Sequence, residues 1–268
     1  MEQLALKSSP EQSGWRSLFY LLISLGIFYV LWWLFIAIIN GFQNQITILP
    51  YPNEVITAFI TGLYEPLSGA TLLDHVGASF FRVLVGTFYA FMIAVPLGLI
   101  LGSYSGADRI GKPIIEILRP IPPIAWIPFA IIAFGIGLLS YGFIIFIGAF
   151  FPLLQNAYDG VKQSPRVYQD VGRSLGASRL QSVFSILFPS ILPNIFTGLR
   201  VSMGVGWMCV IAAEMIGVTN AGIGYFINYT KLIGLYADMM AGMLMIGLVG
   251  LIINYVFKLA EKIVLRGI

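Results

Sequence analysis

The chain has 268 residues, of which 58% are hydrophobic and 10% are charged, and its formal net charge is +3. Soluble domains usually carry charges on about a quarter of their residues. The composition therefore excludes an ordinary soluble protein. Because apolar runs long enough to cross a bilayer recur along the chain, it predicts an all-α integral membrane protein. The small net charge, with scattered lysines and arginines, argues against a nucleic-acid partner.

The first apolar stretch covers residues 17–39 and follows Lys7 and Arg16, an arrangement that resembles a signal peptide. The stretch is too long for a signal sequence, and no small-residue cleavage site follows it. We therefore expect a retained transmembrane helix. Residues 40–76 are mixed in character and are expected to form an outer loop, where the only histidine, His75, is exposed to solvent.

Five further transmembrane helices are expected, which gives about six in all. The third helix of the chain holds five prolines, so it must kink or break, and the break is expected near residues 120–123. Asp108, Arg109 and Lys112 precede it and are expected to form a short charged turn. The five helices are predicted over residues 77–103, 113–136, a segment from the glycine-rich turn 135–142 to about 158, 192–216 and 239–259.

The distribution of basic residues gives the orientation of these helices. Eleven lysines and arginines fall on the face that carries both termini and the loop 158–191, and one, Lys231, falls on the other face. Cytoplasmic loops of membrane proteins are enriched in Lys and Arg. Both termini and the 158–191 loop are therefore predicted to be cytoplasmic, in a multi-pass protein of the cell (inner or plasma) membrane.

No catalytic or metal site is expected. Residues 106–113, GADRIGKP, nearly match the phosphate-binding loop G-x-x-x-x-G-K-[ST], but a membrane helix precedes them and Pro113 replaces the hydroxyl residue. They are interpreted as an inter-helix turn, without a nucleotide site. One histidine and one cysteine, Cys209, are too few for a metal centre, and Cys209 is expected to be a small packing residue.

Three charged side chains inside predicted helices are candidates for a translocation path: Arg82, Arg200 and Glu214. Charges in a membrane are costly unless they are paired or face water. Arg200 and Glu214 share a helix but are about 21 Å apart along it, so they cannot pair with each other; Glu116 and Asp170 are the candidate partners of Arg200. Two interpretations remain open: fixed ion pairs, or contacts with an anionic solute.

The loop between the fourth and fifth helices is the polar centre of the chain. Its pattern predicts two short helices joined at Gly176, with an apolar stripe that includes Val171 and a basic rim that includes Arg166, Arg173 and Arg179. Such a surface fits the groove of a protein partner. It also fits a helix lying on anionic lipid, and the pattern leaves both interpretations open.

This loop resembles the coupling loop of importer-type permeases of ATP-binding-cassette transporters, whose motif is E-A-A-x3-G-x9-I-x-L-P. Asp170-Val171-Gly172 stands for E-A-A, and Gly176, Ile186 and Pro189 follow at the spacing of the family. The departures are Asp170, Val171 and Gly172 for the acid and the two alanines, and Phe188 for leucine. Further segments resemble the nitrate, sulfonate, taurine and bicarbonate subgroup, namely RPIPPIAWIPFAIIAFGIG (119–137), ILPNIFTGLRVSMGVGW (191–207) and AAEMIGVTNAGIGYFI (212–227).

The resemblance implies a type I importer permease fold and a transport subunit that is not itself an enzyme. It implies ATPase subunits that bind ATP and magnesium, an extracytoplasmic substrate-binding protein, and a second permease copy, most simply in a homodimer. The cargo would be a small anion, although related permeases also serve heterocyclic vitamins. The implied coupling residues are Arg166, Asp170, Val171, Gly172, Arg173, Gly176, Ala177, Ile186 and Pro189.

The predicted organisation has three parts. Residues 1–76 hold the N-terminal tail, the first helix and the outer loop; residues 77–260 form a five-helix permease core with the cytoplasmic loop 158–191; and residues 261–268 are a cytoplasmic tail. The alternative function is a self-sufficient channel or secondary carrier. Secondary carriers often contain inverted repeats with paired broken helices, and only one proline-broken helix is evident here.

Overall fold

A computed structural model of the chain describes residues 14–42, 49–165, 181–216 and 221–264, together with Ser174, Gly176 and Ser178. In these residues the secondary structure is helical, apart from one isolated bridge between Leu67 and Ala70. The elements are α1 (Gly14–Phe42), α2 (Pro52–Tyr64), α3 (Leu72–Ser103), α4 (Ser105–Leu118), the 3-10 turn η1 (Pro123–Trp126), α5 (Ile127–Phe134), α6 (Leu138–Gln163), the π-helical turn η2 (Ser182–Leu187), α9 (Phe188–Ser190), α10 (Leu192–Ile216), α11 (Ile223–Leu232) and α12 (Tyr236–Val264).

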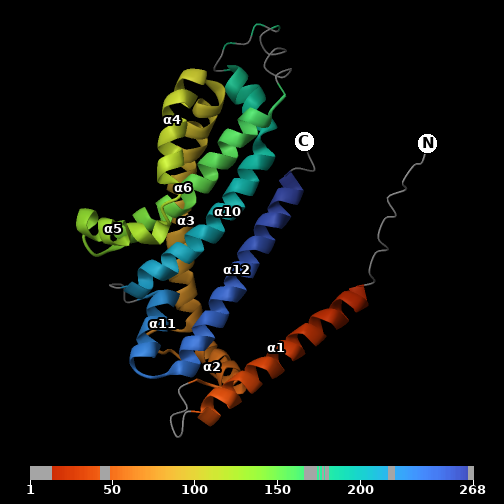
Figure 1. Ribbon diagram of the computed structural model, residues 1–268, viewed down its shortest axis with the longest axis vertical. Helices are drawn as coiled ribbons and strands as arrows, with labels where there is room; N and C mark the ends of the chain where they lie inside the picture. The colour runs from red at the N-terminus through yellow and green to blue at the C-terminus, as the bar shows by residue number, and fades with distance from the viewer. Residues whose placement is uncertain are drawn as a thin grey trace, which may run out of the picture.

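Among the described residues, five helices are long and apolar enough to cross a membrane: α1, α3, α6, α10 and α12. The pair formed by α4 and η1–α5 passes the same test together but is bent by 87°, so the described chain has up to six spans when this pair is counted as one broken span. The prediction of about six spans with one proline-broken helix is therefore confirmed. The C-terminal ends of α3 and α6 lie at the top of Figure 1 and that of α12 lies in its upper half, which agrees with the shared face that the basic residues predict.

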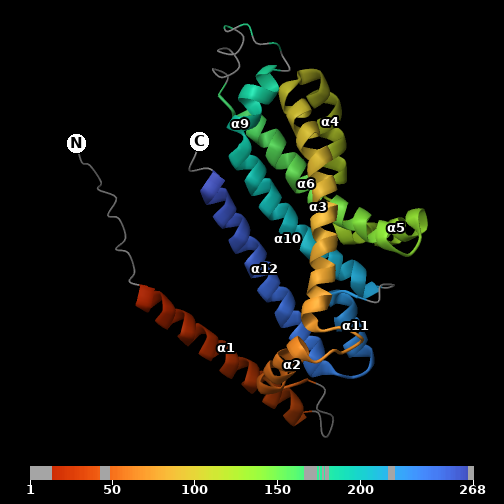
Figure 2. The same cartoon turned by 180° about the vertical axis from the view of Figure 1, so that it is seen from behind.

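The bundle is built around α3, α6 and α10, with α12 beside α10 (Figures 1 and 2). Small residues allow these helices to approach closely. A Cβ added to Gly98 would lie 2.7 Å from Cβ of Ala157, and one added to Gly148 would lie 2.6 Å from Sγ of Cys209. Cys209 is buried in this contact, as its interpretation as a packing residue predicted.

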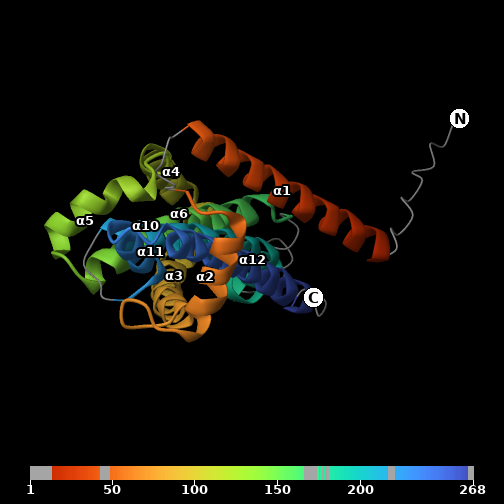
Figure 3. The ribbon, with the colours of Figure 1, turned by 90° about the horizontal axis from the view of Figure 1, so that it is seen from below.

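The charged residues at the start of the broken span are helical, so the predicted turn at Asp108–Lys112 is wrong. They belong to α4, whose first turns are held against α6 because the Asp108 carboxylate accepts hydrogen bonds from the Tyr158 hydroxyl at 2.8 Å and from Lys162 Nζ at 2.7 Å. After α4, the prolines near 120–123 end the helix. The chain turns, and α5 leaves the side of the bundle (Figure 3).

The predicted outer loop 40–76 was also only partly right, because it contains α2 and the start of α3. Helix α2 opens with Pro52 in its first turn, and the Glu54 carboxylate accepts a hydrogen bond from the Tyr51 N–H at 2.9 Å. Helix α3 begins five residues earlier than expected. Thr71 caps it by exchanging hydrogen bonds with Asp74, at 3.3 and 3.0 Å.

Helix α11 lies between the predicted helices 192–216 and 239–259, and α12 continues to Val264, past the predicted start of the tail at 261. Helix α1 meets the bundle at α2 and runs away from it (Figures 1 and 3). Only 6% of the residues in its most apolar stretch are buried. Its apolar surface therefore needs lipid or another polypeptide as its surroundings.

Candidate functional site

The coupling segment is described in part. Arg166, Asp170, Val171, Gly172, Arg173 and Ala177 lie outside the described residues. Gly176 has φ = +78°, in the left-handed region that favours glycine. This conformation is the one that its predicted place in a sharp turn requires.

The second half of the coupling motif lies directly before α10. Ser178 and Gln181 are joined by hydrogen bonds from the backbone N–H of each to the side chain of the other, at 2.9 and 3.3 Å. Ile186 is half-buried in η2, and Pro189 lies in α9, three residues before α10 begins. The second half of the motif is therefore helical and continues almost directly into α10.

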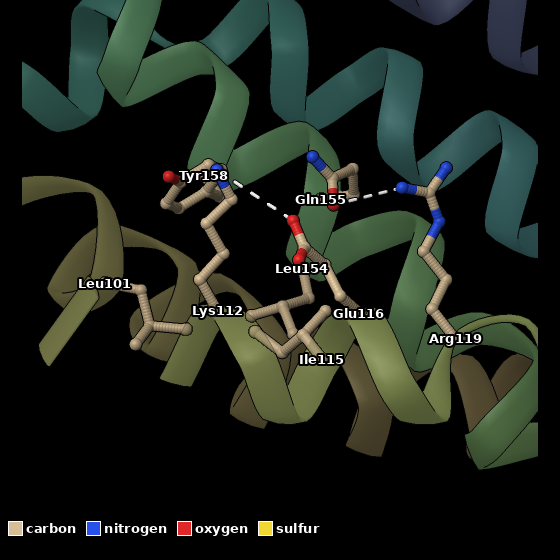
Figure 4. Close-up of a pocket in the computed structure, with 8 residues that line it drawn as sticks. All are labelled: Leu101, Lys112, Ile115, Glu116, Arg119, Leu154, Gln155 and Tyr158. Atoms are coloured by element: carbon tan, nitrogen blue, oxygen red, sulfur yellow. Dashed lines mark hydrogen bonds and ion pairs between the residues drawn. The ribbon is translucent and has the colours of Figure 1, made fainter. Parts of the chain in front are cut away.

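A small cavity separates α4 from α6 at the cytoplasmic side, and Figure 4 shows its lining. Its volume is about 90 Å³. Lys112 Nζ lies 3.8 Å from the Glu116 carboxylate, and an Arg119 guanidinium N–H donates to the Gln155 amide oxygen at 3.4 Å. The side chains of Lys112 and Glu116 are more than half exposed. The cavity is lined by exposed side chains of both charges, so it can hold water or a small polar solute without fixing its orientation.

A second polar cluster is buried at the opposite end of the bundle, which the basic residues place at the outer face. We call it the outer clasp: the side chains of His75, Ser79, Arg82 and Glu214 and the backbone of residues 221–224. The Glu214 side chain has no exposed surface and that of Arg82 is 16% exposed. The Glu214 carboxylate therefore sits in a dry environment, where each unmet hydrogen bond is costly.

The Glu214 carboxylate is the centre of the clasp. It accepts hydrogen bonds from the Ser79 hydroxyl at 2.8 and 2.9 Å, from Arg82 Nη1, and from the N–H of Gly224 at 3.0 Å. Arg82 Nη1 also donates to the carbonyl oxygen of Ala221 at 2.8 Å. The ion pair is thus embedded in a hydrogen-bond network that joins α3, α10 and the start of α11.

Three consecutive N–H groups at the start of α11 are met by side chains of the clasp. The N–H of Gly222 donates to His75 Nδ1 at 3.1 Å, that of Ile223 to Ser79 Oγ at 2.9 Å, and that of Gly224 to Glu214. The first N–H groups of a helix have no partners within the helix. The clasp supplies those partners and places a negative carboxylate at the positive end of the helix dipole.

Two glycines make room for the carboxylate. Gly222 has φ = +140°, and a Cβ there would lie 2.5 Å from both carboxylate oxygens of Glu214. A Cβ on Gly224 would overlap the carbonyl oxygen of Ile211 and lie 2.8 Å from Cβ of Glu214. The Gly222-Ile223-Gly224 sequence is therefore needed for the backbone to close around the side chain.

The expectation of a solvent-exposed His75 is wrong, because its side chain is fully buried. An N–H group can only donate, so Nδ1 must accept from Gly222, and the proton of a neutral ring must lie on Nε2. Nε2 is 3.1 Å from the Ser68 hydroxyl. The sequence signal that could have revealed this is the spacing of His75, Ser79 and Arg82, which lie at intervals of four and three residues on one helix face.

Arg82 also borders a groove between α3, α5 and α6, which we call the outer groove. Its volume is about 500 Å³, and Arg82 is the one charged side chain among the described residues that line it. The guanidinium carbon lies 5.9 Å from the centre of the Tyr141 ring. The lining comprises Phe81, Arg82, Val85, Gly86, Tyr89, Phe134, Leu138, Leu139, Gly142, Phe143 and Phe146.

The structure brings two of the three predicted path residues together and leaves the third apart. Arg200 lies farther along α10, and its Nη1 is 3.2 Å from the Glu261 carboxylate on α12. Glu116, which the sequence suggested as its partner, pairs with Lys112 instead, and Asp170 lies outside the described residues. Arg82 and Arg200 thus form the fixed ion pairs that one interpretation expected. Arg82 also borders the outer groove, where it could contact an anionic solute, as the other interpretation requires.

The fold and these sites define a multi-pass helical membrane protein with polar clusters at both ends of its bundle. Residues 94–268 match the family described as binding-protein-dependent transport system inner membrane component. The chain belongs to this family. It is therefore the permease subunit of an ABC importer, a multi-pass protein of the inner membrane.

Two relatives and one solved structure illustrate the similarity. A putative ABC transporter permease of Methanocaldococcus jannaschii is 40% identical over 87% of this chain and 86% of its own length. A nitrate import permease of Synechocystis sp. is 35% identical over 81% of this chain and 80% of its own. The MetNI methionine ABC transporter, in an inward-facing conformation, superposes with a TM-score of 0.62 at 22% identity, covering 73% of this chain and 95% of that one. This last similarity shows the type I importer permease fold alone.

Proposed function

We propose that this permease subunit carries a small oxyanion of the nitrate, sulfonate or bicarbonate class across the membrane. The observation that carries the proposal is the position of Arg82, a cation fixed by Glu214 at the edge of an otherwise uncharged outer groove. A guanidinium presents its N–H groups in a planar fork that suits oxyanions. The similarity to a nitrate import permease supports the same class of cargo.

The partners follow from the family. The chain pairs with a second permease copy, most simply an identical one, and a separate ATPase hydrolyses ATP with magnesium. A substrate-binding protein delivers the anion to the outer side. The proposed contact with the ATPase is the loop 158–191, and its proposed coupling residues are those named from the sequence resemblance.

Gly176 is the residue best suited to a test of the proposed contact between this loop and the ATPase. Its positive φ is inaccessible to proline, whose φ is fixed near −65°. We expect Gly176→Pro to insert normally but to lose the ATPase subunit and ATP-driven uptake. Gly106→Ala is the matched control, because Gly106 lies in another segment of the cytoplasmic side and a Cβ there meets nothing within 4 Å.

The experiment is co-purification from membranes with a gently solubilised, tagged chain, followed by reconstitution with nitrate, taurine and bicarbonate as separate probes. A stoichiometric ATPase that is present with the wild type and absent with Gly176→Pro supports the coupling proposal. Uptake that is unchanged in Gly176→Pro contradicts it. Flux of any probe without ATP would instead support the self-sufficient channel or carrier.

The cargo proposal has its own test in Arg82. We expect Arg82→Gln to reduce uptake of the transported anion at least tenfold while the ATPase still co-purifies. Arg82→Lys should retain part of the uptake, because it keeps the charge but not the planar fork. Equal uptake by all three proteins would remove Arg82 from the path.

A further inference from the structure

Helix α10 physically connects the coupling segment to the outer clasp. It begins three residues after Pro189 and ends two residues after Glu214. A helix of its 25 residues is about 37 Å long, which is enough to cross the hydrocarbon core of a bilayer. A displacement of the cytoplasmic end of α10 would therefore also displace Glu214, near its outer end.

The hydrogen bonds of the clasp fix how α3, α10 and α11 lie against one another. The Ser79 oxygen accepts from the N–H of Ile223 at 2.9 Å, and its hydroxyl is 2.8 and 2.9 Å from the two Glu214 oxygens and 3.2 Å from the carbonyl oxygen of His75. Every group that meets Glu214 is a donor, so the residue must be an acceptor, and the N–H of Gly224 fixes its position along α11. Apolar contacts can slide by fractions of a turn, but this network cannot do so without leaving buried polar groups unpaired.

We propose that Glu214 is a positioning residue of the transport cycle. It locks the outer ends of α3 and α11 to α10, so that the three move as one unit when α10 is displaced from the coupling segment. Arg82 and its side of the outer groove then move with α10. This inference rests on the proposed function, because it assumes that the coupling segment is displaced by the ATPase.

Tight packing alone would not require this chemistry. Replacing a buried ion pair with apolar residues of similar volume is often neutral or stabilising, so an ion pair is not needed merely to hold helices together. The clasp adds a fixed position of α11 relative to α3 and α10, because three consecutive N–H groups at the start of α11 each bind a particular side chain. A rigid element whose position along its neighbours is fixed is one physical means of passing a displacement between distant sites.

The proposal can be tested by distance measurements that do not depend on the cargo. Single cysteines are placed at Met208 on α10 and, in a separate protein, at Leu232 on α11, both in a Cys209→Ala background. The side chains at these two positions are 69% and 75% exposed, so each position accepts a spin label. Distances between labels on the two copies are measured in the permease–ATPase complex in nanodiscs, with and without a non-hydrolysable ATP analogue.

With an intact clasp, we expect the nucleotide to shift the distance distribution at both positions. Glu214→Gln keeps an acceptor oxygen but removes the charge, so the shift at Leu232 should shrink while that at Met208 persists. The exchange Arg82→Glu with Glu214→Arg restores an ion pair, but a guanidinium on α10 cannot accept from Ser79 or Gly224. The exchange should therefore abolish the Leu232 shift. Met215→Ala, next to Glu214 on the same helix, is the control and should behave as the wild type.

The outcomes separate the two proposals. Full shifts at both positions in Glu214→Gln and in the exchange variant would overturn the positioning role while leaving the coupling proposal intact. Recovery of the Leu232 shift by the exchange variant would also overturn it, because a simple ion pair would then suffice. Absence of a shift at either position in the wild-type complex, with the ATPase bound, would overturn the coupling proposal and this inference with it.

Discussion

The two polar clusters of this chain lie at opposite ends of the same bundle and differ in almost every physical respect. At the outer end, the Glu214 side chain has no exposed surface, and the N–H of Gly224 and the Arg82 guanidinium both donate to its carboxylate. At the cytoplasmic end, Lys112 and Glu116 form an exposed pair at 3.8 Å beside a small cavity. Water can compete for the exposed pair but has no access to the buried carboxylate. The same residue types therefore act as a rigid joint in one place and as an adaptable surface in the other.

This comparison predicts its largest effect at Glu214. Glu214→Ala leaves the Arg82 charge and the N–H of Gly224 buried without the carboxylate, and breaking a buried ion pair costs about 3–5 kcal/mol. The free energy of unfolding, measured by denaturant titration in mixed micelles, should fall by that amount. Met215→Ala on the same helix should change it little. A loss below about 1 kcal/mol for Glu214→Ala would mean that water reaches the clasp.

The next largest effect is expected at Gly222. Its Cβ would lie 2.5 Å from the Glu214 carboxylate oxygens, and its φ of +140° is unfavourable for alanine. Gly222→Ala should therefore destabilise the protein by about 2–4 kcal/mol. Gly247→Ala is the matched control, because nothing lies within 4 Å of a Cβ there. The same titration measures both variants, and equal stability for the two would contradict the close approach at residue 222.

Substitutions of His75 can separate the contribution of its hydrogen bond from that of its packing. His75→Leu fills similar space but leaves the N–H of Gly222 without an acceptor, which costs about 1–3 kcal/mol. His75→Asn offers an oxygen close to the position of Nδ1 and should recover part of that loss. Thermal unfolding of the solubilised variants measures the order. If the leucine variant proved the more stable of the two, the acceptor role of His75 would be wrong.

The smallest effect is expected at the cytoplasmic cavity. Lys112→Ala removes an exposed i, i+4 pair worth less than about 0.5 kcal/mol, so its unfolding free energy should match that of the wild type within error. High salt should erase any remaining difference. A loss comparable to that of Glu214→Ala would show that the two clusters are energetically alike and would remove the contrast between them.

Much of the fold was readable from local pattern. The apolar runs indicated the spans, the prolines near 120–123 indicated the break, and Gly176 was predicted to join two short helices, a position at which it has φ = +78°. The helical state of the charged segment in α4 was missed, because Asp108 is satisfied by Tyr158 and Lys162, which follow it by 50 residues or more. No local pattern announces partners at that distance in the sequence.

The candidate site shows the same division. Charge within an apolar run marked Arg82, Arg200 and Glu214, since such charges need partners. The partners of these charges could not be predicted, because Arg82 and Glu214 are 132 residues apart in the sequence and Arg200 and Glu261 are 61 apart. His75 was misjudged because a polar residue beside a predicted loop is usually exposed, and its burial depends on α11 folding over it.

The class of protein, the number of spans and the family could be read without coordinates, because hydropathy and motif spacing are properties of contiguous segments. Which charges meet, which glycines are pressed against a carboxylate, and where the groove beside Arg82 lies became known from the folded chain. These features depend on the packing of α3, α6, α10 and α11. Hydrogen bonds and ion pairs act over a few ångströms, so they exist only after the helices have brought distant residues together.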